Sequence, residues 1–173
     1  DVSRLSALRH LNISLSLLTA KAETDLTLPA SLRTFIANNA FPYCPDSVMA
    51  TPLESLELSG LKSLPVTVFG ITTQTALRVP NNGLRSIPTF VQEMTNLHIL
   101  NVAKNELERL PYQLFNITGL VELNIDGNRI HTLSTKIARL TALTSLTIPS
   151  DCLVTVRHPA LSIDPTPDGL PPP

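Results

Sequence analysis

Hydrophobic residues recur along this chain at spacings that fit neither a single helix nor a single strand. In the stretch LHILNVAKNELERLP, which begins at Leu97, the leucines and the valine lie at intervals of three, two, five and three positions. A helix would repeat them about every 3.6 residues and a half-buried strand about every second residue. Asn105 stands among them, and an asparagine is costly to bury unless its polar atoms are paired. The pattern predicts a short strand followed by a turn that uses this side chain.

The pattern repeats with a constant period. Four aligned segments start 23 positions apart, at Gln74, Leu97, Leu120 and Leu143. The same place in these segments is occupied by Asn82, Asn105, Asn128 and, in the last, Asp151. A fixed period of about 20 to 50 residues is typical of repeat proteins, in which each unit buries its apolar face against the next.

The motif LxxLxLxxNxLxxLP, which runs from Leu97 to Pro111, resembles the leucine-rich repeat (LRR) of 23 residues. This resemblance implies an α/β solenoid, a right-handed superhelix with a concave parallel β-sheet and a convex side of loops or short helices. We expect about seven coils, which begin near Leu8, Ser31, Leu53, Gln74, Leu97, Leu120 and Leu143.

The chain divides into one domain and a tail. We assign residues 1–163 to the leucine-rich repeat domain and the proline-rich residues 164–173 to a linker or tail, because proline cannot donate a backbone hydrogen bond and favours an extended chain. Solenoids need capping units at their ends, and the first repeat here begins within a few residues of the start. We therefore expect a fragment of a longer chain.

Strand geometry separates core positions from surface positions. Successive side chains of a strand point to opposite faces. The expected core residues of the regular repeats are Leu100, Val102, Leu123, Ile125, Leu146 and Ile148. Ile99, Asn101 and Ala103 lie between such positions, and we expect them to face solvent.

The turn after each strand leaves backbone N–H and C=O groups that water does not reach. An asparagine side chain can pair with such groups in its own coil and in the next one. We predict a structural asparagine ladder that consists of Asn39, Asn82, Asn105 and Asn128. The register before Asn39 is ambiguous by one residue, and the unit that begins at Leu53 has Gly60 in a shorter turn without an asparagine.

The concave face is the candidate binding surface. Adjacent coils stack about 4.8 Å apart, so equivalent strand positions form columns whose side chains are free to contact a partner. The candidate partner-binding residues are Glu57, Arg78, Ile99, Asn101, Lys104, Glu122, Asn124 and Asp126. The alternative is a solvated sheet face, with the partner bound at the edges or on the convex side.

The composition mainly excludes certain classes of partner. The formal charge is -1, charged residues make up 16% of the chain and aromatic residues 4%, and there is no tryptophan. A nucleic-acid binder needs a basic patch or a stacking platform, so we expect no nucleic-acid partner. Apolar stretches are interrupted every few residues, so we expect no direct insertion into a membrane.

Groups able to do chemistry are scattered. His10, His98, His131 and His158 fall at different places in the repeat, without a cysteine or acidic residue at a metal-ligand spacing. Phosphate-binding, GxSxG and HExxH motifs are missing. We expect no intrinsic enzyme activity, no metal and no cofactor; a catalytic domain elsewhere in a longer chain is compatible with this interpretation.

Two cysteines and two sequons complete the motifs. Cys44 and Cys152 lie in distant repeats, so we expect free thiols, with Cys44 buried at a leucine position; Cys152 could instead pair with a cap or partner outside this chain. Asn12 and Asn116 begin N-x-[ST] sequons and are candidate glycosylation sites. This composition yields such triplets by chance, so they do not demonstrate secretion.

These features favour a non-catalytic scaffold that recognises a protein or peptide. Low charge, abundant serine and threonine, and the proline-rich end favour part of a receptor or surface-protein ectodomain, outside the cell or at its surface. One alternative is a cytoplasmic signalling scaffold, because ELERLPYQLFNITGL resembles the repeats of Ras-pathway scaffolds. Another is a structural surface or filament component that associates with copies of itself.

Overall fold

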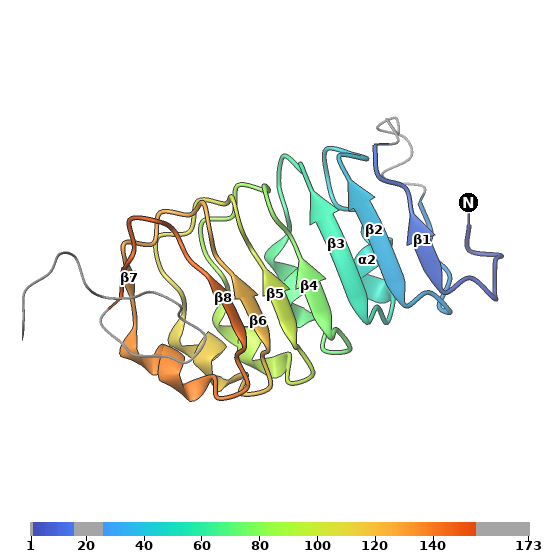
Figure 1. The fold of residues 1–173 in the computed structure, drawn as a ribbon. Helices are drawn as coiled ribbons and strands as arrows, with labels where there is room; N and C mark the ends of the chain where they lie inside the picture. The colour runs from blue at the N-terminus through green and yellow to red at the C-terminus, as the bar shows by residue number, and fades with distance from the viewer. Residues whose placement is uncertain (1, 16–25, 155–173) are drawn as a thin grey trace, which may run out of the picture.

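A computed structural model describes residues 2–15 and 26–154. The predicted tail, residues 164–173, and the predicted end of the repeat domain, residues 155–163, lie outside the described residues, as does His158. The described chain passes repeatedly through one sheet and forms a solenoid (Figure 1).

The concave sheet consists, within the described residues, of seven parallel strands in sequence order (Figure 1). They are β1 (His10–Asn12), β2 (Thr34–Asn38), β3 (Ser55–Ser59), β4 (Ala76–Arg78), β5 (Ile99–Asn101), β6 (Glu122–Asn124) and β8 (Ser145–Thr147). The predicted solenoid with about seven coils is confirmed. A second, two-stranded parallel sheet pairs β7 (Thr132–Leu133) with β9 (Leu153–Val154).

Short helical turns cover the other face of the sheet. The described part contains the α-helix α2 (Ser47–Ala50) and the 3-10 helices η1 (Val66–Gly70), η2 (Thr89–Glu93), η3 (Tyr112–Asn116) and η4 (Thr135–Arg139). Pro65, Pro88 and Pro111 precede η1, η2 and η3. Proline fixes φ and lacks the N–H that the first helical turn leaves unpaired, so it is well suited to start these helices. Before η4, the Ser134 side chain instead accepts the Lys136 N–H.

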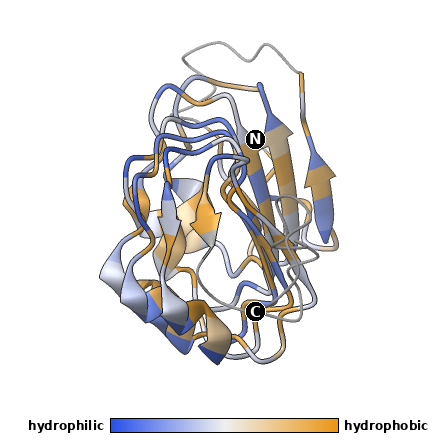
Figure 2. Ribbon diagram, turned by 60° about the vertical axis from the view of Figure 1, so that its left-hand side comes forward, coloured by the Kyte–Doolittle hydropathy of each residue, from blue (hydrophilic) through white to orange (hydrophobic). Residues whose placement is uncertain are grey.

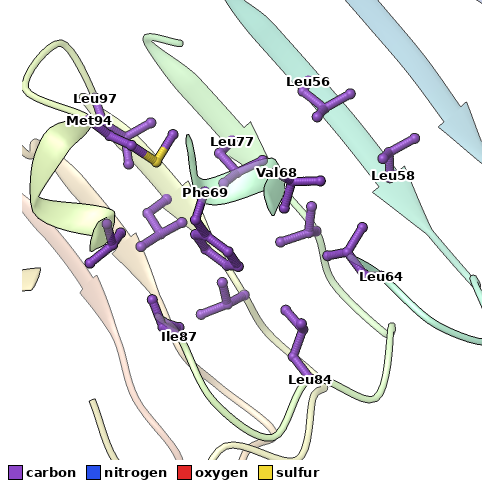
Figure 3. Close-up of a cluster of buried hydrophobic side chains, with 14 of the residues drawn as sticks. Leu56, Leu58, Leu64, Val68, Phe69, Leu77, Leu84, Ile87, Met94 and Leu97 are labelled. Carbon is purple, nitrogen blue, oxygen red and sulfur yellow. The ribbon is translucent and has the colours of Figure 1, made fainter. Parts of the chain in front are cut away.

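The core fills the space between the sheet and the convex turns, which appear as two layers in Figure 2. Leu56 and Leu58 of β3 and Leu77 of β4 pack in one cluster with Val68 and Phe69 of η1 (Figure 3), and all five are fully buried. Burial of such a side chain contributes about 1.5–3 kcal/mol. The strands are too short to be stable alone, so this shared core holds them in the sheet.

Most of the predicted core is confirmed. Leu100, Val102, Leu123 and Ile125 are completely buried. Leu146 and Ile148 are only partly buried, which corrects the prediction. They belong to β8 and the turn that follows it. Because β8 is the last strand of the described sheet, these side chains pack against a preceding coil on one side only.

Two alanines on the concave face are buried, although this face was predicted to be solvent-exposed. Ala76 and Ala103 are each 7% exposed. In the sheet, Ala76 pairs with Ser55 on one side and Ile99 on the other. A methyl group between the longer side chains of neighbouring coils is shielded by them, so the prediction of solvent exposure for Ala103 was wrong even though the strand alternation was right.

The asparagine ladder pairs the backbone of the buried turns. Asn105 Oδ1 accepts the N–H groups of Asn82 at 2.9 Å and Leu84 at 3.0 Å. Asn105 Nδ2 donates to the carbonyl oxygens of Val79 at 3.0 Å and Val102 at 2.8 Å. One side chain therefore joins its own turn to the turn of the preceding coil.

Asn82 and Asn128 repeat this arrangement one coil earlier and one coil later. Asn82 Nδ2 donates to the Leu58 carbonyl oxygen, and Asn128 Oδ1 accepts the Leu107 N–H. Asn82, Asn105 and Asn128 are 4%, 6% and 8% exposed. These three members of the predicted ladder are confirmed.

Asn39 does not belong to the ladder. It is exposed and has a φ of 53°. The residues immediately before the three confirmed members also have positive φ; they are Asn81, Lys104 and Gly127. Asn39 therefore occupies this preceding position, and Ala40 takes the ladder position. The sequence misled the prediction because asparagine also tolerates the left-handed backbone better than most residues.

Gly60 makes the shortened turn as predicted. Its φ is 75°, and a Cβ atom at this place would clash with Asn39 Oδ1. The next residue, Leu61, donates its N–H to Asn82 Oδ1 at 3.0 Å. The ladder therefore begins from Asn82, which reaches back to a coil that has no asparagine of its own at this position.

Asn105→Ala is expected to lower the free energy of unfolding by about 2 kcal/mol or more, because each buried group left unpaired costs about 1–3 kcal/mol. Asn101→Ala is the matched control. Asn101 is half-buried on the concave face, and its Oδ1 accepts only the nearby Ala103 N–H, so we expect a change within about 0.5 kcal/mol. Urea unfolding followed by circular dichroism measures both variants. Equal unfolding midpoints would contradict the ladder.

Gln74 is a polar side chain at a core position. It stands where Leu97 and Leu120 open the next repeats, it is completely buried, and its Oε1 and Nε2 have no hydrogen-bond partner in the described residues. Gln74→Leu is therefore expected to stabilise the protein by about 1–3 kcal/mol. Leu97→Gln, the reverse change at the equivalent position, should destabilise it. Calorimetric melting temperatures measure both, and a lower value for Gln74→Leu would show that the amide has a stabilising role.

Candidate recognition surface on the concave face

The sheet register brings the candidate binding residues together. One row across β3 to β6 contains Glu57, Arg78, Asn101 and Asn124, whose neighbours pair directly in the parallel sheet. In the adjacent row, Ile99 of β5 pairs with Glu122 of β6. Consecutive members of a row are about 4.8 Å apart, within reach of one ligand.

Asp126 and Lys104 extend the surface on the other side. Asp126 follows Asn124 by two residues, so its side chain lies on the same face. Lys104 is exposed, has a left-handed backbone with a φ of 54°, and donates its N–H to the Asp126 carbonyl oxygen at 2.7 Å. Seven of the eight predicted residues thus lie on the concave face, and Lys104 lies on the turn that follows β5; their binding role stays a prediction.

Polar groups over β2 and β3 are already paired with one another. Asn38 Nδ2 donates to Glu57 Oε1 at 2.6 Å, and Ser59 Oγ donates to Asn38 Oδ1 at 2.8 Å. Glu57 is therefore less available to a partner than the sequence suggested. Asn38 was missed as a concave residue, although it follows the buried strand residue Ala37 and this alternation could have identified it.

Charges over β4, β5 and β6 have no ionic partner in the described chain. Ion pairs of the described residues join Arg33 to Glu54, Arg85 and Arg129 to Glu106, and His131 to Asp151. Arg78, Lys104, Glu122 and Asp126 take part in none of these. The carboxylate that neighbours Arg78 in its row is that of Glu57, which bonds to Asn38 instead. The concave charges over these strands are thus available to a ligand.

Asn101 and Asn124 present oriented amide donors. Asn101 Oδ1 accepts the Ala103 N–H at 3.0 Å, and Asn124 Oδ1 accepts the Asp126 N–H at 3.1 Å. Each bond identifies which end of the amide carries the oxygen and holds it against its own backbone. The Nδ2 group of each side chain is then left to donate to a partner.

An apolar floor lies among these polar groups. Ile99 is half-buried and pairs with the buried Ala76 in the sheet, whereas the buried Ala103 lies four residues beyond Ile99 on the same face. Aliphatic side chains at this depth offer contact area without the desolvation penalty of a charge. The surface over β4 to β6 therefore combines apolar side chains with charged and hydrogen-bonding groups.

A cavity of about 580 Å³ opens beside α2, where its lining includes Leu26, Leu28, Tyr43, Cys44 and Asp46. Burial raises the pKa of the Cys44 thiol to about 12, and the nearby Asp46 carboxylate adds to the rise. A thiol with this pKa is almost entirely protonated at neutral pH and is a poor nucleophile. Among the described residues, no group of three or more His, Cys, Asp and Glu side chains is arranged to hold a metal ion.

The two sequon asparagines lie on different faces. Asn116 is exposed at the end of η3, and its Nδ2 donates to Gln92 Oε1 at 3.2 Å. Asn12 is exposed on β1, where its Oδ1 accepts the Ser14 N–H. A glycan on Asn116 would leave the concave face open, whereas one on Asn12 would cover its β1 end. Glycosylation of either residue stays a prediction.

Comparison with solved structures identifies the fold. A leucine-rich repeat protein of Leptospira interrogans superposes with a TM-score of 0.69 at 21% sequence identity, over 90% of this chain and 40% of that protein. An internalin-like protein of Listeria monocytogenes superposes with a TM-score of 0.61, also at 21% identity, over 90% of this chain and 60% of that protein. The chain therefore has the leucine-rich repeat fold, and it spans less than two thirds of either neighbour.

Comparisons of sequence alone find no match, either to a protein-family model or to a curated protein. Among the described residues, no helix has the length and apolar character needed to cross a membrane.

Cys44 and Cys152 should differ in reactivity. Both are free. The pKa of Cys152 is raised by partial burial and, to a smaller extent, by Asp151. The pKa of Cys44 is raised to about 12, so roughly one Cys44 thiol in ten thousand is a thiolate at pH 8. Iodoacetamide at pH 8, followed by mass spectrometry, should therefore label Cys152 first.

Urea-unfolded protein provides the control for this experiment, because both thiols should then react at similar rates. The variants Cys44→Ser and Cys152→Ser assign the fast and slow phases. Equal labelling rates in the folded protein would contradict the raised pKa of Cys44.

Proposed function

We propose that this chain is a non-catalytic protein-recognition scaffold that binds a protein or peptide through its concave face. The observation that carries the proposal is the surface over β4 to β6, where charges without ionic partners and oriented amide donors surround Ile99. The buried core and the ladder use none of these side chains. Surface groups that do not hold the fold are free to serve recognition.

We assign this scaffold to the ectodomain of a leucine-rich repeat receptor or surface protein. Low overall charge and abundant serine and threonine support this location. The alternative, a cytoplasmic scaffold, is supported by the two free thiols. An antibody raised against the chain should label intact cells of the source organism; labelling that requires permeabilised cells would support the cytoplasmic alternative.

Self-association is a second candidate function, because both ends of the described sheet expose leucines. Leu5 and Leu15 near β1 are 52% and 77% exposed, and Leu153 of β9 is 68% exposed. Contact between unlike ends of successive copies would build an open filament. Light scattering over a range of concentrations tests this function, and a mass that stays monomeric would reject it.

The concave proposal is tested with a library of random 12-residue peptides displayed on phage and selected on the immobilised protein. The triple variant Arg78→Ala, Asn101→Ala, Glu122→Ala is expected to bind the selected peptides at least about tenfold more weakly, which corresponds to about 1.4 kcal/mol. Its melting temperature should stay close to that of the unsubstituted protein, because these residues do not line the core.

The control variant carries alanine at three exposed positions away from the concave row, Glu93, Glu108 and Arg139. It should bind the selected peptides as the unsubstituted protein does. Loss of affinity in this control, with none in the concave triple variant, would place binding elsewhere and reject the proposal.

A further inference from the structure

From the arrangement of unpaired charges we infer the chemistry of the partner: an extended peptide segment that crosses the strands, with a basic side chain over β6 and an acidic side chain over β4. The inference rests on the proposed function, because it specifies the ligand of the same concave surface. It uses the positions of Arg78, Glu122 and Asp126 relative to one another.

The acidic end of the surface lies over β6. Glu122 and Asp126 are half-buried and lie two residues before and two residues after Asn124, on the same face. Neither carboxylate has an ionic partner in the described residues. A lysine or arginine side chain placed above Asn124 lies between both carboxylates and gains from both, more strongly than at a fully exposed site because partial burial reduces screening.

Lys104 is a cation beside this pair, since its N–H donates to the Asp126 carbonyl oxygen. It is exposed on the left-handed turn one residue beyond Ala103 and forms no ion pair with Asp126. Its flexible side chain can extend into solvent. Two carboxylates and one exposed ammonium leave the surface around Asn124 with a net negative charge.

The basic end lies over β4. Arg78 is half-buried and takes part in none of the ion pairs of the described residues, and the Glu57 carboxylate beside it in the row bonds to Asn38. A planar guanidinium pairs with a carboxylate through two parallel hydrogen bonds. An aspartate or glutamate of the partner is the group that this geometry favours.

The distance between the two ends sets the spacing of the charges in the partner. β4 and β6 are separated by two strand steps, or about 10 Å. A peptide in the extended polyproline II conformation advances about 3.1 Å per residue and completes a turn every three residues, so basic and acidic residues three positions apart span about 9 Å on the same side of the peptide. Asn101 lies between the two ends in the row, and Ile99, two residues earlier on the same face, favours a small or apolar side chain beside it.

The oriented amides complete the recognition of an extended segment. Asn101 and Asn124 are adjacent in one row, and each has its Nδ2 group available. Carbonyl oxygens of the partner's main chain are suitable acceptors, and main-chain contacts tolerate variation in the partner's sequence. Specificity would then come from the two charges and their spacing.

The same 12-residue phage library tests this inference, with a second selection on the variant Arg78→Glu, Glu122→Lys, Asp126→Lys. Peptides selected on the unsubstituted protein should be enriched in a lysine or arginine two to four positions from an aspartate or glutamate. They should lose at least about tenfold in affinity for the charge-reversed variant. Synthetic versions with the two charges exchanged should lose affinity for the unsubstituted protein.

The matched control, Arg139→Glu, Glu93→Lys, Glu108→Lys, makes the same charge changes away from the concave row. It should bind the selected peptides as the unsubstituted protein does. If the selected peptides bind the concave alanine variant more weakly but show no charge pattern, this inference is overturned and the proposed function stands. Peptides indifferent to both concave variants, or a library with no enriched binder, would overturn both.

A second copy of the chain is the remaining occupant that the experiment detects. If soluble unsubstituted protein at micromolar concentration displaces the selected peptides, while the charge-reversed variant does not, the concave face binds another copy. That result would overturn the assignment to a peptide segment of a different protein.

Discussion

Each coil of this solenoid has to turn away from the sheet inside the protein, and the backbone groups of that turn have to find partners there. Asn105 pairs with several of them: its Oδ1 accepts the N–H groups of Asn82 and Leu84 in the preceding coil. Its Nδ2 donates to the carbonyl oxygens of Val79 in the preceding coil and Val102 in its own. Because one asparagine joins two turns, it also holds one coil against the next. A constant period from Asn82 to Asn105 to Asn128 fits this constraint, since the same side chain has to return at the same place in each of these coils.

Stacking of the coils in turn produces the concave surface. When Leu77, Leu100 and Leu123 align in the core, the residues between core positions align as well, and a row that crosses the strands results. The two halves of the sheet use these rows differently. Over β2 and β3 the polar groups bond to one another, as Asn38 does to Glu57. Over β4 to β6 the concave polar side chains bond to their own backbone or to no other group of the described chain. The ladder asparagines Asn82, Asn105 and Asn128 lie in the turns that follow these three strands.

The repeat period and strand alternation predicted most of the fold from sequence, because both reflect burial that recurs in every coil. The errors occurred where the outcome depends on neighbours. Asn39 is an asparagine near the ladder position, but it lies one residue before that position. Asparagine is suited to a left-handed turn as well as to the ladder. Ile148 has the right alternation, yet its exposure depends on whether a coil covers it. The sequence left the register at Asn39 ambiguous by one residue, and it did not show whether a further coil covers Ile148.

The candidate surface was predicted in outline and not in detail for the same reason. Strand alternation placed Glu57 and Arg78 side by side on the concave face, and the register confirms that placement. Alternation does not reveal that Glu57 bonds to Asn38, because that contact depends on side-chain geometry between coils. Availability of a charge, as distinct from its position, could be read only from the structure.

Asn101 and Asn105 show how the fold separates stability from recognition. They are four residues apart and chemically identical, yet one holds its carbonyl oxygen against the adjacent Ala103 N–H on the surface and the other joins two coils in the interior. The only difference is their place relative to the strand. Substitution in the concave row therefore changes what the surface can bind while leaving the buried turns paired. A ladder of fixed side chains beneath a surface of replaceable ones lets the same solenoid present different binding faces.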